Sequence, residues 1–483
     1  MTLKEKTISG LTWSFIDNFI GQGINFLVGI ILARLLTPKE FGLIGMIAIF
    51  IAISQSFVNS GFSQALIRKQ NANQTDYSTI FYFNMLVGIF FYLLLFVFAG
   101  YIANFFDEPQ LKMLVRVLGI GIIINALTII QTTTLTKNVN FKLQTKISVI
   151  SGILSGLIGV ALAYSGYGVW SLVWRTIAGY FVTSGLLWFW NRWKPIAVFS
   201  IQSLKELFSF GSKLLASGLI DTIYTNVYYL IIGKYFSAND LGYYTRAEMF
   251  KNLPSQNIQS VISKVSFPVL SSIQDDKTVL KTAYKKLIKS SMLITFVLMI
   301  GMAAVAEPMV ITLVGVKWQP CIIYLQMLCF VGMLYPLHAL NLNMLQVQGR
   351  SDLYLRLEII KKMLAIPVIA VGIIWGVKIM ILGMFINSLF AYYLNSYYSG
   401  GFIGYSMSEQ IKDILPSFFL AIFVGSIVFL TGYFMKVMPW IKLSIQIGMG
   451  TFLTFGICEI LKIPDYIYIK EIVFDKLYKK RKQ

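Results

Sequence analysis

The chain has very few of the residues from which metal sites and catalytic relays are commonly built. Its 483 residues include one histidine, His338, and three cysteines, Cys321, Cys329 and Cys458. One histidine cannot form a cluster of histidines, and the cysteine spacing matches neither a metal motif nor a disulfide framework. We expect the cysteines to fill an apolar core and His338 to be a polar interior residue. The sequence predicts no metal site, no cofactor and no catalytic residue.

Charged residues are also scarce, at 13% of the chain, whereas 57% of the residues are hydrophobic. Water-soluble domains cannot bury so much apolar surface. Apolar runs follow one another along the whole chain, and about 20 such residues suffice to cross the hydrocarbon core of a bilayer. The sequence therefore predicts an all-α polytopic membrane protein with about 14 transmembrane helices. The expected spans are 11–35, 41–64, 79–103, 110–134, 146–164, 168–190, 213–233, 240–262, 288–306, 318–345, 357–376, 379–400, 412–434 and 440–461.

The charge that is present is mostly positive, since Lys and Arg number 41 against 21 Asp and Glu. The basic residues gather in alternate loops between the apolar runs, and short basic loops stay in the cytoplasm. This pattern predicts that both termini are cytoplasmic. The first apolar run is too long for a signal-peptide core, so we expect the N-terminus to be retained. The net charge of +20 is interpreted as a topology signal that also attracts anionic lipid, and it indicates no nucleic-acid partner.

One interruption of the apolar pattern occurs twice. The segment "IILARLLTPKEFGLIGMI" at 30–47 is matched by "IIGKYFSANDLGYYTR" at 231–246, with Thr37 against Ser237, Glu40 against Asp240 and Gly42 against Gly242. In both copies a Ser or Thr followed three residues later by an acidic residue is a helix-start signal. An even number of spans separates the copies. We therefore expect two parallel six-helix halves related by an axis along the membrane normal, followed by two C-terminal helices.

This duplication predicts the domain organisation. The expected units are an N-terminal half at 1–195, an interfacial connecting helix at 196–212, a C-terminal half at 213–405, two additional helices at 406–463 and a basic cytoplasmic tail at 464–483. The connecting helix is amphipathic, with Ile201, Leu204 and Leu207 on one face. The tail is either a second interfacial helix or a disordered segment.

Polar residues inside the apolar spans are the candidates for a functional site. Asn18, Gln22 and Asn25 share one face of the first span, with Asp17 beside them. In the seventh span, Asp221 and Tyr228 belong to a similar stripe, and Tyr224 adjoins it. Intramembrane carboxylates face protein or water rather than lipid. The stripes therefore either line a cavity or join helices by hydrogen bonds.

Cations and one further carboxylate complete this inventory. Arg116 and Arg175 lie inside the fourth and sixth spans, where each either reaches the interface or binds an anionic ligand. Arg246 and Glu248 belong to an unusually polar eighth span that also contains Pro254, which favours a bent helix lining water or a polar ligand. Asp17, Asp221 and Glu248 are candidates for carrying a coupling proton or sodium ion, and each could instead be a structural counter-ion to an arginine.

The segments "LARLLTPKEFGLIGM", "LGYYTRAEMFKNLP" and "FPVLSSIQDD" resemble the polysaccharide-transport family of the multidrug/oligosaccharidyl-lipid/polysaccharide exporter superfamily, in particular flippases of lipopolysaccharide and exopolysaccharide biosynthesis. The resemblance covers most of the chain. It implies movement of a lipid-linked oligosaccharide, with undecaprenyl diphosphate as the usual lipid, across the bacterial cytoplasmic membrane. It also implies membrane lipids, a coupling H⁺ or Na⁺ and polysaccharide-assembly proteins as partners. Such a transporter is not an enzyme, and it would work by alternating access between the halves.

Under this resemblance the substrate-binding candidates are Arg116, Arg175, Arg246, Asn18, Gln22, Asn25, Tyr224 and Tyr228. Two other functions stay open. A multidrug or small-cation antiporter of the same superfamily would favour a cavity dominated by carboxylates. A membrane-embedded glycan polymerase or transferase would need long external loops, whereas the expected outer loops here are short.

Overall fold

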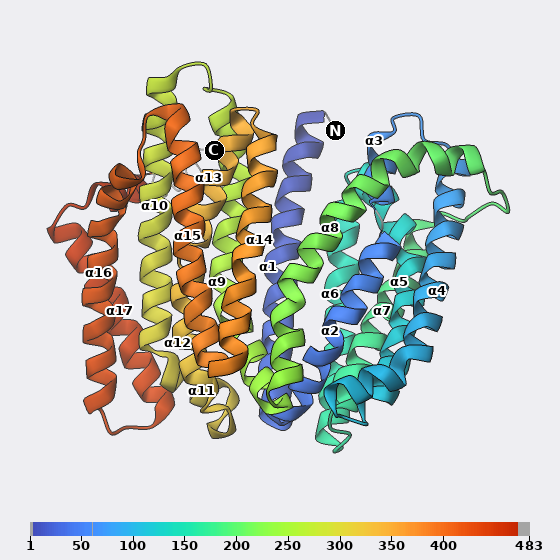
Figure 1. The fold of residues 1–483 in the computed structure, drawn as a ribbon, viewed down its shortest axis with the longest axis horizontal. Coiled ribbons are helices and arrows are strands. Elements are labelled where there is room, and N and C mark those ends of the chain that lie inside the picture. Colours follow the sequence, from blue (N-terminus) through green and yellow to red (C-terminus); the bar gives the residue numbers. More distant parts are fainter. Residues whose placement is uncertain (1–2, 60, 472–483) are drawn as a thin grey trace. The chain divides into compact units, whose positions relative to one another are not determined.

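The computed structural model describes residues 3–59 and 61–471, and all regular elements in that part of the chain are helices (Figure 1). The all-α prediction is confirmed. The helices up to residue 235 are α1 (Leu3–Leu35), α2 (Pro38–Asn59), α3 (Phe62–Arg68), α4 (Gln74–Phe106), α5 (Leu111–Lys137), α6 (Phe141–Tyr164), α7 (Trp170–Asn191) and α8 (Ile201–Tyr235). The later helices are α9 (Ala238–Ser271), α10 (Lys277–Ala304), α11 (Ala306–Val314), the 3₁₀ helix η1 (Val316–Trp318), α12 (Cys321–Gly332), α13 (Tyr335–Val347), α14 (Ser351–Trp375), α15 (Val377–Ile403), α16 (Met407–Phe434) and α17 (Pro439–Ile460).

Eleven helical stretches among the described residues are long and apolar enough to cross a membrane. They are Ile16–Leu35, Pro38–Arg68, Gln74–Phe106, Leu111–Lys137, Phe141–Tyr164, Ile201–Tyr235, Lys277–Ala304, Cys321–Val347, Val377–Ile403, Met407–Phe434 and Pro439–Ile460. The helices α7, α9 and α14 coincide with other expected spans but are not among the eleven. The count of 14 therefore stays a prediction.

The expected span 318–345 is broken in the structure into α12 and α13. Pro336 lies in the first turn of α13. Proline suits that position because its missing N–H would have no intrahelical partner there. The continuous apolar pattern concealed this break.

The chain divides into two compact units, Met1–Gly242 and Tyr243–Gln483. In the first unit, α8 packs against α2, α3 and α4. The expected connecting helix at 196–212 and the expected beginning of the second half at 213 meet inside α8, which runs without a break from Ile201 to Tyr235. The symmetry of the two halves stays a prediction.

The duplicated helix starts have matching hydrogen bonds. Glu40 Oε2 accepts from the Thr37 backbone N–H at 2.6 Å and from its hydroxyl at 2.8 Å. Asp240 Oδ2 accepts from the Ser237 N–H at 3.3 Å and from its hydroxyl at 2.6 Å. In the second copy the Asp240 N–H also donates to the Ser237 hydroxyl at 3.0 Å. The predicted reach of the acidic residue back to the helix start is confirmed in both copies.

The two copies also pack against each other inside the first unit, and they do so reciprocally. A Cβ added to Gly42 would lie 1.7 Å from the Ala238 carbonyl oxygen, and one added to Gly242 would lie 2.0 Å from the Pro38 carbonyl oxygen. Each duplicated glycine therefore lets the first turn of the other copy's helix approach. We call residues 36–42 and 236–242 the paired hairpins.

In the second unit, three ion pairs join α10 to later elements. Lys281 pairs with Glu409 at 3.1 Å, Lys285 with Asp413 at 2.8 Å and Lys289 with Asp465 at 3.4 Å. Asp465 is the second residue of the expected basic tail, whose residues 464–471 are helical. The rest of that tail, 472–483, lies outside the described residues.

The scarce histidine and cysteines have the interior positions expected of them. All three cysteines are free and buried. His338 contacts the Ser388 hydroxyl through Nε2 at 2.8 Å and the Asn395 amide through Nδ1 at 3.4 Å. Both predictions are confirmed. Among residues 3–59 and 61–471, no group of three His, Cys, Asp or Glu side chains is arranged to hold a metal ion.

Candidate functional site

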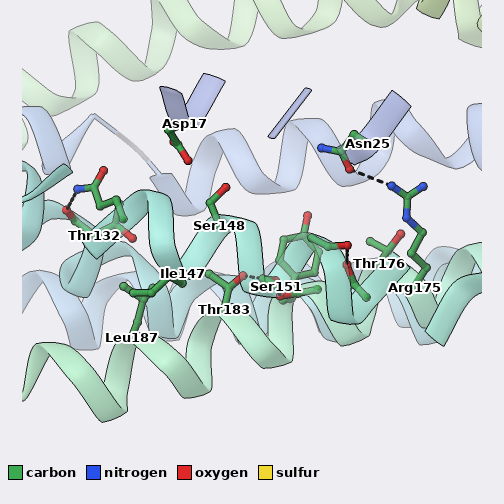
Figure 2. A pocket seen from close by; sticks show the side chains of 15 residues that line it. Asp17, Asn25, Thr132, Ile147, Ser148, Ser151, Arg175, Thr176, Thr183 and Leu187 are labelled. Atoms are coloured by element: carbon green, nitrogen blue, oxygen red, sulfur yellow. Dashed lines mark hydrogen bonds between the residues drawn. The ribbon is translucent and has the colours of Figure 1, made fainter. Parts of the chain in front are cut away.

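A pocket of about 570 Å³ lies within the first unit, where α6 packs against both α1 and α7 (Figure 2). This volume is in the range of small-molecule binding sites. The lining is mostly polar, and its residues are Asp17, Asn25, Thr132, Gln144, Ile147, Ser148, Ser151, Gly152, Ser155, Arg175, Thr176, Gly179, Tyr180, Thr183 and Leu187. A polar pocket inside apolar helices is expensive to build, which makes it the leading candidate for a binding site.

Small residues on α6 allow its neighbours to come close. A Cβ added to Gly156 would lie 2.6 Å from the Val28 side chain of α1. One added to Gly159 would lie 2.8 Å from Cβ and 3.1 Å from Cγ of Arg175 on α7. Small residues spaced along a helix permit such close packing in membranes. Gly159 thereby provides the space in which the stem of Arg175 lies.

Arg175 supplies positive charge to the pocket. Its Nη2 donates to Oδ1 of Asn25 on α1 at 2.9 Å (Figure 2). A guanidinium carries five N–H donors, so a single bond to an amide leaves donors for a ligand. Because the fork of a guanidinium matches phosphate oxygens, this end of the pocket suits a phosphate group.

Two rows of hydroxyl groups face the pocket between its charged residues. Ser148, Ser151 and Ser155 lie on α6 at helical spacing, and Thr176, Tyr180 and Thr183 do the same on α7. The rows are joined, because the Thr183 hydroxyl donates to Ser151 Oγ at 2.7 Å and the Ser151 hydroxyl donates to the Gly179 carbonyl at 2.9 Å. Tyr180 accepts from Nε2 of Gln55 on α2 at 2.5 Å. Such a lining suits a ligand with many hydroxyl groups.

Asp17 supplies the negative charge. Figure 2 shows its carboxylate beside Ser148. Its Oδ1 is buried and has no hydrogen-bond partner among the described residues. Asp17 and Asn25 are separated along α1 by about 12 Å of helical rise. The pocket therefore has a cationic end and a separate anionic point.

The other two predicted residues of α1 are not part of the lining. Asn18 is exposed and Gln22 is half-buried. The polar stripe expected on α1 thus contributes Asp17 and Asn25 to the pocket.

Arg116 lies elsewhere in the first unit, near the beginning of α5. Its guanidinium stacks over the ring of Phe96 on α4 at 4.3 Å, and its Nε donates to the Phe96 carbonyl at 3.4 Å. It is not among the residues that line the pocket. The two arginines that the sequence presented as equivalents therefore have different surroundings.

Arg246 and Glu248 belong to the second unit. Arg246 is 3% exposed, and its guanidinium lies over the ring of Trp318 at 5.1 Å. Glu248 Oε1 lies 3.8 Å from Nζ of the buried Lys251, which also donates to the Tyr335 hydroxyl at 3.3 Å. These charges have partners within their own unit.

The predicted residues of the seventh span lie along α8. Asp221 is exposed, Tyr224 is half-buried and Tyr228 is buried. They do not line the pocket of Figure 2. Of the eleven predicted site residues, this pocket brings together Arg175, Asn25 and Asp17.

The hydroxyl rows of α6 and α7 were missed by sequence reasoning. Their spacing of three and four residues was a usable signal. Single serines and threonines in apolar helices are common, however, and they usually bond their own backbone.

Comparison with known proteins gives three kinds of likeness. A family model described as "Polysaccharide biosynthesis protein" matches residues 31–323. The chain is 26% identical over 359 residues to the teichuronic acid biosynthesis protein TuaB of Bacillus subtilis, covering 73% of each chain. It is 27% identical over 380 residues to the lipopolysaccharide biosynthesis protein WzxC of Escherichia coli, covering 77% of this chain and 76% of that one.

Two solved structures resemble the fold. The lipid II flippase MurJ matches with a TM-score of 0.75 at 16% identity, covering 94% of this chain and 98% of that one. An inward-facing multidrug resistance transporter of the MATE family matches with a TM-score of 0.60 at 16% identity, covering 78% of this chain and 94% of that one. At this identity the likeness shows a shared fold.

Proposed function

Because this chain belongs to the polysaccharide biosynthesis protein family, we propose that it is a flippase that moves a lipid-linked oligosaccharide across the bacterial cytoplasmic membrane. The relatives named for teichuronic acid and lipopolysaccharide biosynthesis support a role in making a cell-surface polysaccharide. Undecaprenyl diphosphate is the proposed lipid carrier.

One observation carries the proposal at the level of residues. Arg175 lies in a polar pocket among apolar helices, with Asn25 at 2.9 Å from its guanidinium. A cation inside the membrane raises the free energy of the folded protein unless a partner or a bound ligand compensates its charge. The neutral amide of Asn25 compensates only part of it. A diphosphate would complete that pairing through two parallel hydrogen bonds.

The rest of the pocket is consistent with a sugar headgroup. The hydroxyl rows of α6 and α7 can hydrogen-bond to a glycan, and the prenyl chain can stay in the surrounding lipid. We propose that transport proceeds by alternating access, as in other transporters built from repeats. No covalent step is needed, so the protein acts as a transporter rather than an enzyme.

The source of energy is part of the proposal. Asp17, Asp221 and Glu248 are the candidates for carrying a coupling H⁺ or Na⁺, because carboxylates inside membrane helices commonly mark ion pathways. Polysaccharide-assembly proteins and membrane lipids are the proposed partners. Arg116, Arg246, Asn18, Gln22, Tyr224 and Tyr228 remain proposed contributors to substrate binding outside the pocket of Figure 2.

A second candidate function is favoured by Asp17. A carboxylate in the pocket is what a small-cation or multidrug antiporter would use to bind its substrate. Since Arg175 lines the same pocket, a cationic substrate would meet repulsion there.

The test is a flipping assay with purified protein in liposomes. A lipid diphosphate carrying a fluorescent oligosaccharide is placed in both leaflets, and an impermeant quencher reports how fast molecules exchange. We expect Arg175→Gln to slow exchange at least about tenfold, because the charged pairing with phosphate is lost. Arg175→Lys should keep part of the rate, because it retains the charge without the fork.

Arg356→Gln is the matched control. Arg356 is exposed on α14, belongs to the second unit and does not line the pocket. It should exchange lipid at the wild-type rate. A wild-type rate for Arg175→Gln would contradict the proposed binding role. Transport of an organic cation, with no exchange of the lipid diphosphate, would favour the antiporter.

A further inference from the structure

We propose that the pocket selects its glycan by hydrogen-bond polarity, accepting neutral or amino sugars near the diphosphate and rejecting acidic ones, with Asp17 as the specificity-determining residue. This inference rests on the proposed function. It assigns the class of sugar that the site takes.

The first observation is that most hydroxyl protons of the lining are already donated within the protein, whereas the Tyr180 hydroxyl accepts from Gln55. The Ser151 hydroxyl donates to the Gly179 carbonyl at 2.9 Å, and the Thr176 hydroxyl donates to the Leu172 carbonyl at 2.9 Å. The Thr183 hydroxyl donates to Ser151 at 2.7 Å. A hydroxyl has one proton to give and two lone pairs to offer. These side chains therefore offer the pocket their lone pairs rather than their protons.

The same holds beyond the α6 and α7 rows. The Thr132 hydroxyl donates to the Thr128 carbonyl at 3.0 Å. The Gln144 amide nitrogen donates to the Thr136 hydroxyl at 2.9 Å and also lies 3.4 Å from the Thr132 carbonyl. Away from Arg175, the lining thus presents mainly acceptors.

The second observation is the carboxylate at the other part of the pocket. Asp17 lines the pocket, and its Oδ1 is buried with no hydrogen-bond partner among the described residues. A buried acceptor without a partner costs free energy that a donating ligand group would recover. Sugar hydroxyls, acetamido N–H groups and ammonium groups are such donors.

The position of Asp17 indicates which sugar it contacts. About 12 Å of helical rise separates it from Asn25, the partner of Arg175. With a phosphate at Arg175, the first sugar lies among the hydroxyl rows and the following sugar comes near Asp17. A uronic acid there would place two carboxylates together among acceptors, and such like-charge contacts oppose binding strongly.

The experiment measures binding to the full chain in lipid nanodiscs by calorimetry. The probes are three farnesyl diphosphates with a common first N-acetylglucosamine and a second sugar that is N-acetylglucosamine, glucosamine or glucuronic acid. For the wild type we expect the glucuronic acid probe to bind at least about tenfold more weakly than the other two. Asp17→Asn should reduce that difference to within about threefold, because the amide removes the charge and adds a donor.

Asp275→Asn is the matched control, because Asp275 is exposed between α9 and α10. It should keep the full difference among the three probes. The wild-type comparison does not depend on the folding of any variant. Equal binding of all three probes to the wild type would overturn the inference and leave the proposed flippase standing. Failure of all three to bind would overturn both.

Discussion

At the scale of single residues, Arg175 and Arg116 show what the sequence could and could not tell. Both are arginines in apolar runs, and both could reach the interface or bind an anion. In the structure Arg175 lies in the pocket beside Asn25, whereas Arg116 stacks on Phe96. The difference comes from the neighbouring helices, because Gly159 on α6 leaves space for the aliphatic part of the Arg175 side chain.

That glycine gives the first prediction at this scale. In Gly159→Ala the new methyl group would meet Cβ of Arg175 at 2.8 Å, and Cβ cannot swing away as the end of a side chain can. We expect α7 to shift and Arg175 to leave Asn25, at a cost of about 1–3 kcal/mol in unfolding free energy. Exchange of the lipid diphosphate in liposomes should fall nearly as far as in Arg175→Gln.

Gly185→Ala is the control for this change. Gly185 also lies on a helix of the pocket, α7, but an added Cβ there would meet no atom within 4 Å. It should leave both melting temperature and lipid exchange unchanged or slightly improved, because alanine favours helices over glycine. Equal behaviour of the two variants would show that Gly159 does not position Arg175.

At the scale of elements, the paired hairpins are the feature that the sequence repeat announced. The repeated Ser or Thr and acidic residues predicted two helix starts, and both have the expected hydrogen bonds. The sequence did not reveal that the copies touch. Gly42 approaches the backbone of Ala238, and Gly242 approaches the backbone of Pro38. The repeated glycine is thus explained by a contact between the copies.

Because the two contacts are reciprocal, we expect that the losses of unfolding free energy from substituting Gly42 and Gly242 do not add. Gly42→Ala and Gly242→Ala should each lower the unfolding free energy by about 1–3 kcal/mol, because the methyl group meets a backbone carbonyl. The double variant should cost clearly less than the sum, since the first substitution already separates the paired hairpins. Thermal melting of the purified proteins in one detergent measures all three.

Gly23→Ala serves as the control, because an added Cβ on that part of α1 would meet no atom within 4 Å. It should melt like the wild type. Strictly additive losses for Gly42→Ala and Gly242→Ala would mean that the two glycines act in separate contacts.

At the scale of the whole molecule, the distribution of basic residues predicts the orientation in the membrane. Lys and Arg outnumber Asp and Glu by 41 to 21, and the excess gathers in alternate loops and at the C-terminal end. Basic loops resist translocation, so both termini should be cytoplasmic. A green fluorescent protein fused after Gln483 should fluoresce, and alkaline phosphatase fused there should be inactive.

The matched fusion is placed at Val437, in the turn between α16 and α17. One expected span, α17, separates this site from the C-terminal end, so the fusion at Val437 should lie on the opposite side of the membrane. Alkaline phosphatase fused there should be active, and green fluorescent protein should not fluoresce. Active phosphatase after Gln483 would reverse the orientation and move the cytoplasmic side to the other end of the helices.

The sequence by itself determined the class of protein, the helical architecture and the family resemblance, because hydrophobic length, helix-start signals and charge distribution act locally along the chain. It also singled out Asp17, Asn25 and Arg175, since polar residues are conspicuous in apolar runs. Only the tertiary structure decided which of these meet. The pocket forms because Gly156 and Gly159 allow α1 and α7 to pack closely against α6. Its lining is rich in acceptors because the hydroxyl groups already donate their protons to backbone carbonyls. Such pairings between distant helices leave no periodic trace in the sequence, because each is fixed by packing rather than by spacing.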